Sequence, residues 1–306
     1  MKRIPVEATL GGAYRFLFTN IVSVIGTVWF PFVLFFGLCG GLFYLSVPHE
    51  WLSGNFPHPK SLRDAIAAMM PLLRIYPACL LLMLLMVAMV FTGLMRHALG
   101  LKTTTTFVYF SLGAPVWRMI GAYLLVWVVE VILIAVLAVL FCAVWKFAVP
   151  TIPHGAGIAL LVVLGTIEVL LAIYAAVRLS FFIPAVVVAE NRIGLGRAWS
   201  LGGGNFWRII IVVLLTTIPV AVVFNIVLQM TVMPAVMAEA MKLAPAAKSA
   251  HHVNPEQIAA FLHALLPVLP VFLAVALVQR LAIIGLLSGA IGKAYNAVTA
   301  PDAPAE

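Results

Sequence analysis

The sequence predicts an all-α, polytopic membrane protein with six transmembrane helices, arranged as three parallel two-span repeats with amphipathic surface helices. Two observations lead to this fold class. Apolar residues make up 64% of the 306 residues and charged residues only 9%, whereas a soluble domain carries about 25% charged residues. The apolar residues also gather in runs of membrane-spanning length. A soluble fold this apolar would leave large exposed patches in water, which a bilayer would instead solvate.

Six apolar runs follow one another along the chain. They cover about residues 21–46, 75–99, 119–149, 157–189, 207–236 and 264–292. The first run is too long for the apolar region of a signal peptide, so we expect it to be a retained span. No segment between runs is long enough for a soluble domain. We therefore expect one integral membrane domain over residues 1–306, with a fraying tail at 300–306.

The distribution of basic residues between the runs predicts the orientation of the chain. With the N-terminus inside, ten basic residues lie on the cytoplasmic side: Lys2, Arg3, Arg15, Arg96, Lys102, Arg118, Arg192, Arg197, Arg208 and Lys293. Six lie outside: Lys60, Arg63, Arg74, Lys146, Lys242 and Lys248. This bias predicts a bacterial inner-membrane protein with both termini in the cytoplasm. The basic residues do not form a nucleic-acid patch, so the expected partner is the lipid bilayer, with a protein partner or a second copy left open.

A short pattern recurs before two of the runs. Residues 110–120 and 199–210 both contain Ser-Leu-Gly followed by Trp-Arg, and a weaker copy begins at Tyr14. We interpret these as three units, over about residues 1–103, 104–193 and 194–299, each with a surface helix and two spans. The surface helices are expected at 5–20, 104–117 and 194–206. Two spans per unit would make the copies parallel, whereas convergence on a common membrane-entry pattern is the alternative.

The first surface helix is predicted to be amphipathic. At helical spacing, one face is apolar, and a charged face lies opposite. The apolar face contains Leu10, Tyr14, Leu17, Phe18 and Ile21. Such a helix lies along the membrane surface before the chain enters the first span.

Four charged residues fall inside apolar runs: Glu130, Glu168, Arg178 and Arg280. An ionised side chain there costs about 2.5–3.5 kcal/mol on insertion scales, so these residues should pair or neutralise. At 1.5 Å per residue, Glu130, Arg178 and Arg280 reach a similar depth, and we expect Glu130 to contact one of the guanidinium groups directly or through water. This cluster is either a structural ion pair or a transport or binding site; snorkelling of Arg178 at the inner edge is a third reading.

Other candidate sites are weaker. Cys39, Cys79 and Cys142 lie in apolar runs and are interpreted as small apolar residues. His251, His252, Glu256 and His263 lack the one-face spacing of metal ligands, so no metal is expected. Gly37-x3-Gly41 and Gly285-x3-Gly289 predict close helix crossings, within the chain or between copies.

A longer motif runs from the fourth span into the third surface helix. It consists of Arg178-Leu179-Ser180, Pro184, Glu190 and Ala198-Trp199-Ser200-Leu201. This motif resembles the signature of a broad bacterial family of six-span proteins, which includes the membrane domain fused to some glycerophosphodiester phosphodiesterases. The family-like residues are Arg178, Pro184, Glu190 and Ser200. The resemblance implies architecture rather than activity, because the phosphodiesterase itself would need a soluble barrel with acidic metal ligands.

The sequence offers no nucleophile–base pair, carboxylate dyad or metal cluster, which disfavours an enzyme and predicts no cofactor. We expect a non-enzymatic integral inner-membrane protein that acts as a scaffold or as a partner- or lipid-binding envelope factor. The alternative is a small-solute or lipid transporter or channel with its site at Glu130, Arg178 and Arg280. A polar cavity at mid-membrane would favour transport, and a dry interior would favour a scaffold.

Overall fold

The computed structural model describes residues 2–48, 62–238, 241 and 267–300. In this part of the chain every regular element is a helix. The helices are α1 (Val6–Thr19), α2 (Ile21–Ser46), α4 (Leu62–Ala98), α5 (Ala114–Ala143), α6 (His154–Ser180), α7 (Ile183–Glu190), α8 (Leu195–Gly202), α9 (Phe206–Thr231) and α12 (Leu269–Thr299). A π-helix, Val144–Ala148, and a 3-10 turn, Val149–Thr151, join α5 to α6.

Six of these segments are long and apolar enough to cross a membrane. They cover Ile21–Ser46, Met69–Ala98, Ala114–Thr151, Gly155–Glu190, Phe206–Thr231 and Leu269–Thr299. Each coincides with one of the six apolar runs, so the all-α fold class and the six membrane-competent helices are confirmed. The length and apolar composition of these six helices are those of a membrane protein.

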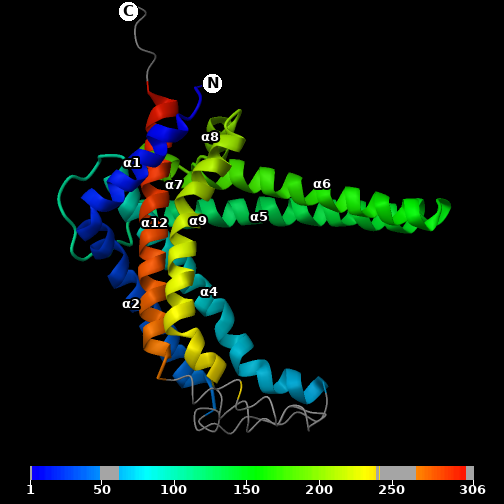
Figure 1. Ribbon diagram of the computed structural model, residues 1–306, viewed down its shortest axis with the longest axis horizontal. Coiled ribbons are helices and arrows are strands. Elements are labelled where there is room, and N and C mark those ends of the chain that lie inside the picture. The colour runs from blue at the N-terminus through cyan, green and yellow to red at the C-terminus, as the bar shows by residue number, and fades with distance from the viewer. Residues whose placement is uncertain (1, 49–61, 239–240, 242–266, 301–306) are drawn as a thin grey trace, which may run out of the picture.

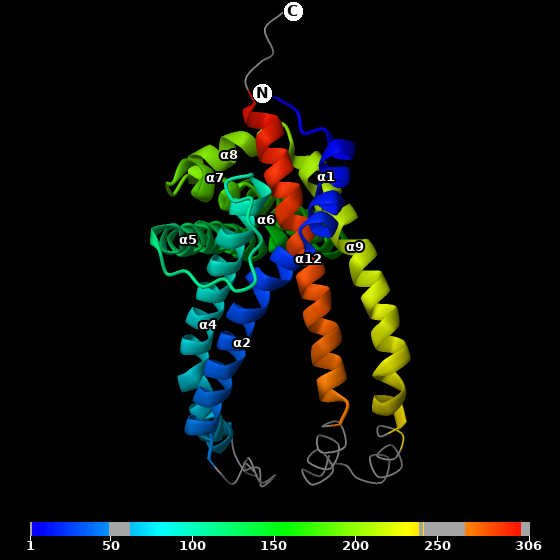
Figure 2. The ribbon, with the colours of Figure 1, turned by 90° about the vertical axis from the view of Figure 1, so that its left-hand side faces the viewer.

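Four of the six long helices run together. In Figures 1 and 2, α2 lies beside α4 and α9 lies beside α12, and the two pairs meet near α1. The beginning of α1 and the end of α12 lie at the same end of the molecule, which we call the α1 end (Figure 1). An even number of crossings would place both on one side of a bilayer.

The hairpin of α5 and α6 does not run alongside the other long helices, as helices of the predicted six-span bundle would (Figure 1). It projects sideways from the other four long helices (Figure 1). The buried residues of α5, which are Val116, Met119, Ala122 and Val126, all lie in its first half. The hairpin therefore packs on the body at its root only, and its outer half exposes apolar side chains.

The largest core lies near the α1 end, where α7 is enclosed by its neighbours. Residues Ile183–Val187 of α7 are all buried, and they belong to the same core cluster as Met95 of α4 and Leu286 of α12. The chain turns at Phe181–Phe182, directly before α7. Pro184 lies in the first turn of α7, where its missing N–H has no cost, and it could not have continued α6.

Glycines let α1 cross close to α12. A Cβ on Gly285 would lie 2.7 Å from Leu17 Cδ1, and one on Gly289 would lie 2.9 Å from Phe16 Cβ. The crossing predicted from Gly285-x3-Gly289 is thereby confirmed within the chain. Gly37 and Gly41 have open space around them among the described residues, so a contact there between copies stays a prediction.

Helices are present at two of the three positions where surface helices were predicted, and their place at the membrane surface stays a prediction. The helix predicted at 5–20 is α1, and the helix predicted at 194–206 is the shorter α8. The helix predicted at 104–117 is wrong, because residues 101–113 are irregular and α5 begins only at Ala114. The run Thr103–Thr106 is β-branched and favours helix poorly.

Residues 99–113 are held against α2 instead of forming a helix. The Thr106 backbone N–H donates to Ser23 Oγ at 3.2 Å, and Trp29 Nε1 donates to the Phe107 carbonyl at 2.8 Å. A Cβ on Gly26 would lie 1.9 Å from the Thr106 carbonyl oxygen. This segment and the sideways hairpin make the second unit unlike the first and third, so the threefold rotational repeat stays a prediction.

Candidate functional site

Arg178, a member of the predicted charge cluster, lies in the last turn of α6. Its guanidinium donates to the Tyr174 hydroxyl at 2.6 Å and to the Trp199 carbonyl at 2.9 Å. It also stacks on the Trp199 ring at 3.9 Å and lies 5.3 Å from the Tyr174 ring centroid. The π faces of both rings attract the cation. Arg178 therefore keeps its charge and is held by two aromatic rings and two neutral oxygens, which join α6 to α8, while its buried Nε has no hydrogen-bond partner among the described residues.

The other three charges do not meet Arg178. Among the described residues, Glu130 forms no ion pair or hydrogen bond, so the direct contact with Arg178 or Arg280 is not found. Arg280 is exposed on α12, and Glu168 lies on α6 with one carboxylate oxygen buried and unpartnered. The physical reason is geometric, since Arg178 faces α8 at the root of the hairpin. Contact through water, and any role of the four charges, stay predictions.

The structure brings the family-like residues together at the junction of α6, α7 and α8. Glu190 ends α7 and accepts hydrogen bonds from Arg192, Arg197 and Tyr295. Ser200 Oγ donates to the Arg197 carbonyl at 2.8 Å within α8. Arg178 and Glu190 of the motif thus both contact α8, Arg178 through Trp199 and Glu190 through Arg197, and so fix this short helix against α6 and α7.

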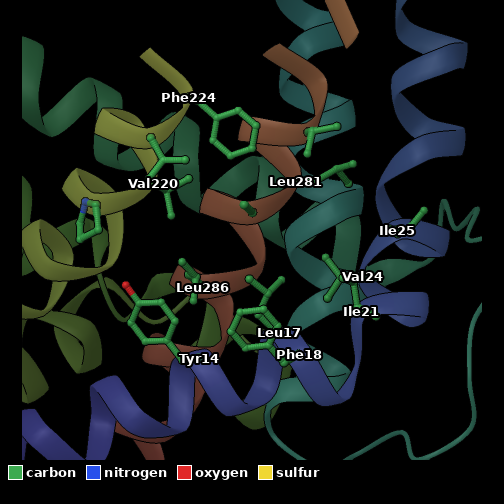
Figure 3. Close-up of a pocket in the computed structure, with 14 residues that line it drawn as sticks. Tyr14, Leu17, Phe18, Ile21, Val24, Ile25, Val220, Phe224, Leu281 and Leu286 are labelled. Carbon is green, nitrogen blue, oxygen red and sulfur yellow. The ribbon is translucent and has the colours of Figure 1, made fainter. Parts of the chain in front are cut away.

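A pocket lies next to α1, on the body of four long helices. It is lined by α1, α2, α9 and α12, and Figure 3 shows Tyr14, Leu17 and Phe18 of α1 closing one end of it. Val220 and Phe224 of α9 form one flank. The remaining lining comes from Ile21, Val24, Ile25, Pro219, Val223, Val278, Leu281, Ala282 and Leu286. We call this the apolar pocket.

The apolar pocket is roomy and almost free of polar groups. Its volume is about 460 Å³, within the range of small-molecule sites. The one hydroxyl in its lining belongs to Tyr14, which donates to the Leu215 carbonyl at 3.3 Å. Rim residues such as Phe18 and Val223 are 68% and 57% exposed, so the pocket opens toward the surroundings of the helices. Such a site binds through burial of apolar surface.

Metal binding finds no support in the described residues, which hold no group of three or more His, Cys, Asp or Glu side chains placed to bind an ion. His251, His252, Glu256 and His263 lie outside the described residues. Cys39 on α2, Cys79 on α4 and Cys142 on α5 are free thiols.

Comparisons with known proteins give no relative. No protein-family model, curated protein or solved structure matches the chain. The resemblance to the six-span family therefore stays a proposal that rests on the motif around Arg178 and Glu190.

Sequence reasoning missed the pocket and one buried amide. Four of the five residues predicted on the apolar face of the first surface helix line the pocket, but periodicity alone could not show that this face meets α9 as well as α12. Asn205 is buried between α8 and α9, where its Oδ1 accepts from the Ile4 backbone N–H at 2.9 Å. Its side-chain nitrogen donates to the Lys2 carbonyl at 3.1 Å. The sequence signal that could have indicated this contact is a polar residue, Asn205, directly before an apolar run.

Proposed function

We propose that this chain is a non-enzymatic integral membrane protein that holds an acyl chain of a membrane phospholipid in the apolar pocket. The observation that carries the proposal is the pocket itself, a volume of about 460 Å³ with one hydroxyl in its lining. An acyl chain is the apolar ligand that a bilayer supplies at high concentration. Such a chain gains by burial against the pocket walls and needs no polar partner there.

The place of the pocket supports a lipid over a dissolved solute. Its walls come from three membrane-competent helices, and α1, which the sequence predicts to lie along the membrane surface, closes one end (Figure 3). A lipid chain lying along α9 would thus reach the surface helix near its own headgroup level. A small polar solute would find almost no hydrogen-bonding group in the pocket.

The remaining parts of the proposal rest on the sequence. A bacterial inner membrane and cytoplasmic termini follow from the loop charge bias. The alternative, transport through Glu130, Arg178 and Arg280, relies on a shared site. Arg178 directs its hydrogen bonds to Tyr174 and Trp199 instead, which favours lipid binding.

The test is lipid retention by a variant with a filled pocket. Val220 lines the pocket, so Val220→Phe places a larger side chain where the acyl chain would lie. The parent and the variant are purified in mild detergent, and the phospholipid bound per chain is measured by native mass spectrometry. We expect the variant to lose one tightly retained phospholipid.

Val162→Phe is the matched control, because Val162 is 63% exposed on the hairpin and does not line the pocket. It should retain lipid like the parent. Equal retention by all three proteins would overturn the proposed function. So would equal losses from Val220→Phe and Val162→Phe.

A further inference from the structure

Three arginines meet beside the α6–α8 junction. Arg192 donates to Glu190 Oε2 through Nε at 2.9 Å and through Nη2 at 2.5 Å. Arg197 donates to Glu190 Oε1 through Nε at 3.1 Å, and Arg118 of α5 donates to the side-chain oxygen of Asn191. We call Arg118, Arg192 and Arg197 the basic cluster. Asn191 has a left-handed backbone, with φ 54°, and this turn returns the chain so that α8 lies beside the end of α7.

The basic cluster carries more positive charge than its partner neutralises. One carboxylate, Glu190, pairs with two guanidinium groups, those of Arg192 and Arg197, while Arg118 contacts only the neutral side chain of Asn191. Both oxygens of Glu190 are already used, since Tyr295 also donates to Oε1 at 3.0 Å. Within the described residues Arg197 donates through Nε alone and Arg118 through one terminal nitrogen. The side chains of Arg192 and Arg197 are 61% and 42% exposed, so their remaining N–H groups can reach an outside ligand.

Two exposed tryptophans lie next to the basic cluster in the sequence. Trp117 precedes Arg118 and is 58% exposed, and Trp199 follows Arg197 in α8 and is 37% exposed. Exposed tryptophans of membrane proteins gather at the headgroup level. Figures 1 and 2 show α8 at the α1 end of the molecule. At the headgroup level the phosphate groups of the lipids would lie within reach of the unneutralised arginines.

We propose that the basic cluster binds the phosphate of an anionic phospholipid headgroup. Guanidinium groups bind phosphate oxygens through paired N–H donors, with geometry that a lysine does not match. Basic pockets between membrane helices are a recurring way of holding anionic lipids. This site is separate from the apolar pocket, which is lined by α1, α2, α9 and α12, and it does not depend on the function proposed for that pocket.

The experiment uses the full chain, purified and exposed to mixed micelles with equal amounts of phosphatidylglycerol and phosphatidylcholine. Native mass spectrometry gives the ratio of the two lipids in the singly occupied protein. We expect phosphatidylglycerol to predominate in the parent. Each basic side chain near an anionic surface raises the affinity for anionic lipid about fivefold. The double variant Arg192→Gln with Arg197→Gln should therefore lower the ratio of phosphatidylglycerol to phosphatidylcholine by about 25-fold. Arg118→Gln alone should lower it by about fivefold.

Two variants separate headgroup binding from structure and from net charge. Glu190→Gln keeps the three cations and removes the competing anion, so the ratio should be equal to or above that of the parent. Lys146→Gln with Arg63→Gln removes two exposed charges elsewhere and should leave the ratio unchanged. If Glu190→Gln lowers the ratio as much as the double variant Arg192→Gln with Arg197→Gln does, the cluster only stabilises the fold and the proposal is overturned.

The source of the phosphate and the folding of the variants are tested in the same preparation. Inorganic phosphate at millimolar concentration should not displace phosphatidylglycerol. Displacement would mean that the site binds a dissolved anion, and the proposal of a lipid ligand would be overturned. If the double arginine variant unfolds, Arg118→Gln, whose partner is the Asn191 side chain, decides the outcome alone. An unchanged ratio in folded Arg118→Gln then contradicts the proposal.

Discussion

Arg178 shows how a cation is accommodated at the edge of an apolar helix. Its guanidinium lies between Tyr174 and Trp199 and donates to an oxygen of each residue. Those contacts join α6 to the short helix α8. Glu130, by contrast, has no hydrogen bond or ion pair within the described residues. The two charges should therefore respond differently to neutral substitutions.

Arg178→Gln is expected to lower the free energy of unfolding by about 2–3 kcal/mol, because it removes cation–π stacking and charge-assisted hydrogen bonds. Glu130→Gln should change it by less than about 0.5 kcal/mol, since no partner is lost. Unfolding of purified protein in mixed micelles with increasing denaturing detergent measures both. Equal destabilisation by the two substitutions, restored in the double variant, would bring back the ion pair predicted from the sequence.

The buried amide of Asn205 gives a second test at the scale of one residue. Asn205→Leu leaves the Ile4 N–H without its acceptor and the Lys2 carbonyl without this donor, and a stranded buried polar group costs about 1–3 kcal/mol. We expect a loss of that size in the same unfolding measurement. Asn225→Leu is the matched control, because Asn225 is exposed on α9. An equal effect of both changes would mean that the contacts of Asn205 do not stabilise the fold.

At the scale of elements, the joint between α2 and residues 99–113 depends on Gly26. A Cβ at this position would lie 1.9 Å from the Thr106 carbonyl oxygen. Gly26→Ala should therefore displace the segment and raise its protease sensitivity, at an overpacking cost of about 1–3 kcal/mol. Gly40→Ala in the same helix meets open space and should be neutral or slightly stabilising. Unchanged proteolysis of Gly26→Ala would contradict the observed joint.

Sequence patterns predicted the long helices but not their arrangement. Hydropathy depends on local composition, so all six membrane-competent helices were placed correctly. The apolar face predicted for α1 was only partly the buried one: Tyr14 and Leu17 are half-buried beside the pocket, but the buried residues of the helix are Thr9 and Ala13, and Phe18 is 68% exposed. The prediction of a helix at 104–117 was wrong because it followed the recurring Trp-Arg pattern and gave too little weight to the four successive threonines, which favour helix poorly. Depth along a span could not show that Arg178 turns toward Trp199, since depth carries no information about the direction of a side chain.

At the scale of the whole molecule, two exposed apolar surfaces need to be distinguished. The α5–α6 hairpin projects from the body (Figure 1), and many apolar side chains along its outer half are exposed. The apolar pocket is concave and lies on the body, beside α1. Lipid would contact the hairpin transiently, whereas the walls of the pocket would hold a chain longer because more of its surface is buried there.

The predicted topology belongs to the same scale. Single cysteines at Ser61 and Ala250, in a background without Cys39, Cys79 and Cys142, should react with a membrane-impermeant maleimide from outside intact cells. The loop charge bias requires this result. Both sites lie outside the described residues. Labelling of either cysteine only after the inner membrane is opened would reverse or break the six-span topology.

The most direct test of acyl-chain binding uses a phospholipid with a photoreactive diazirine in its acyl chain. After reconstitution and illumination, adducts are mapped by mass spectrometry. We expect adducts on Val220, Phe224 and Leu281 to exceed those on Val128 and Val162, which are 42% and 63% exposed on the hairpin. Val220→Phe should remove the pocket adducts and leave those on the hairpin. Even labelling of all exposed apolar side chains, unchanged by Val220→Phe, would contradict a lipid chain held in the pocket.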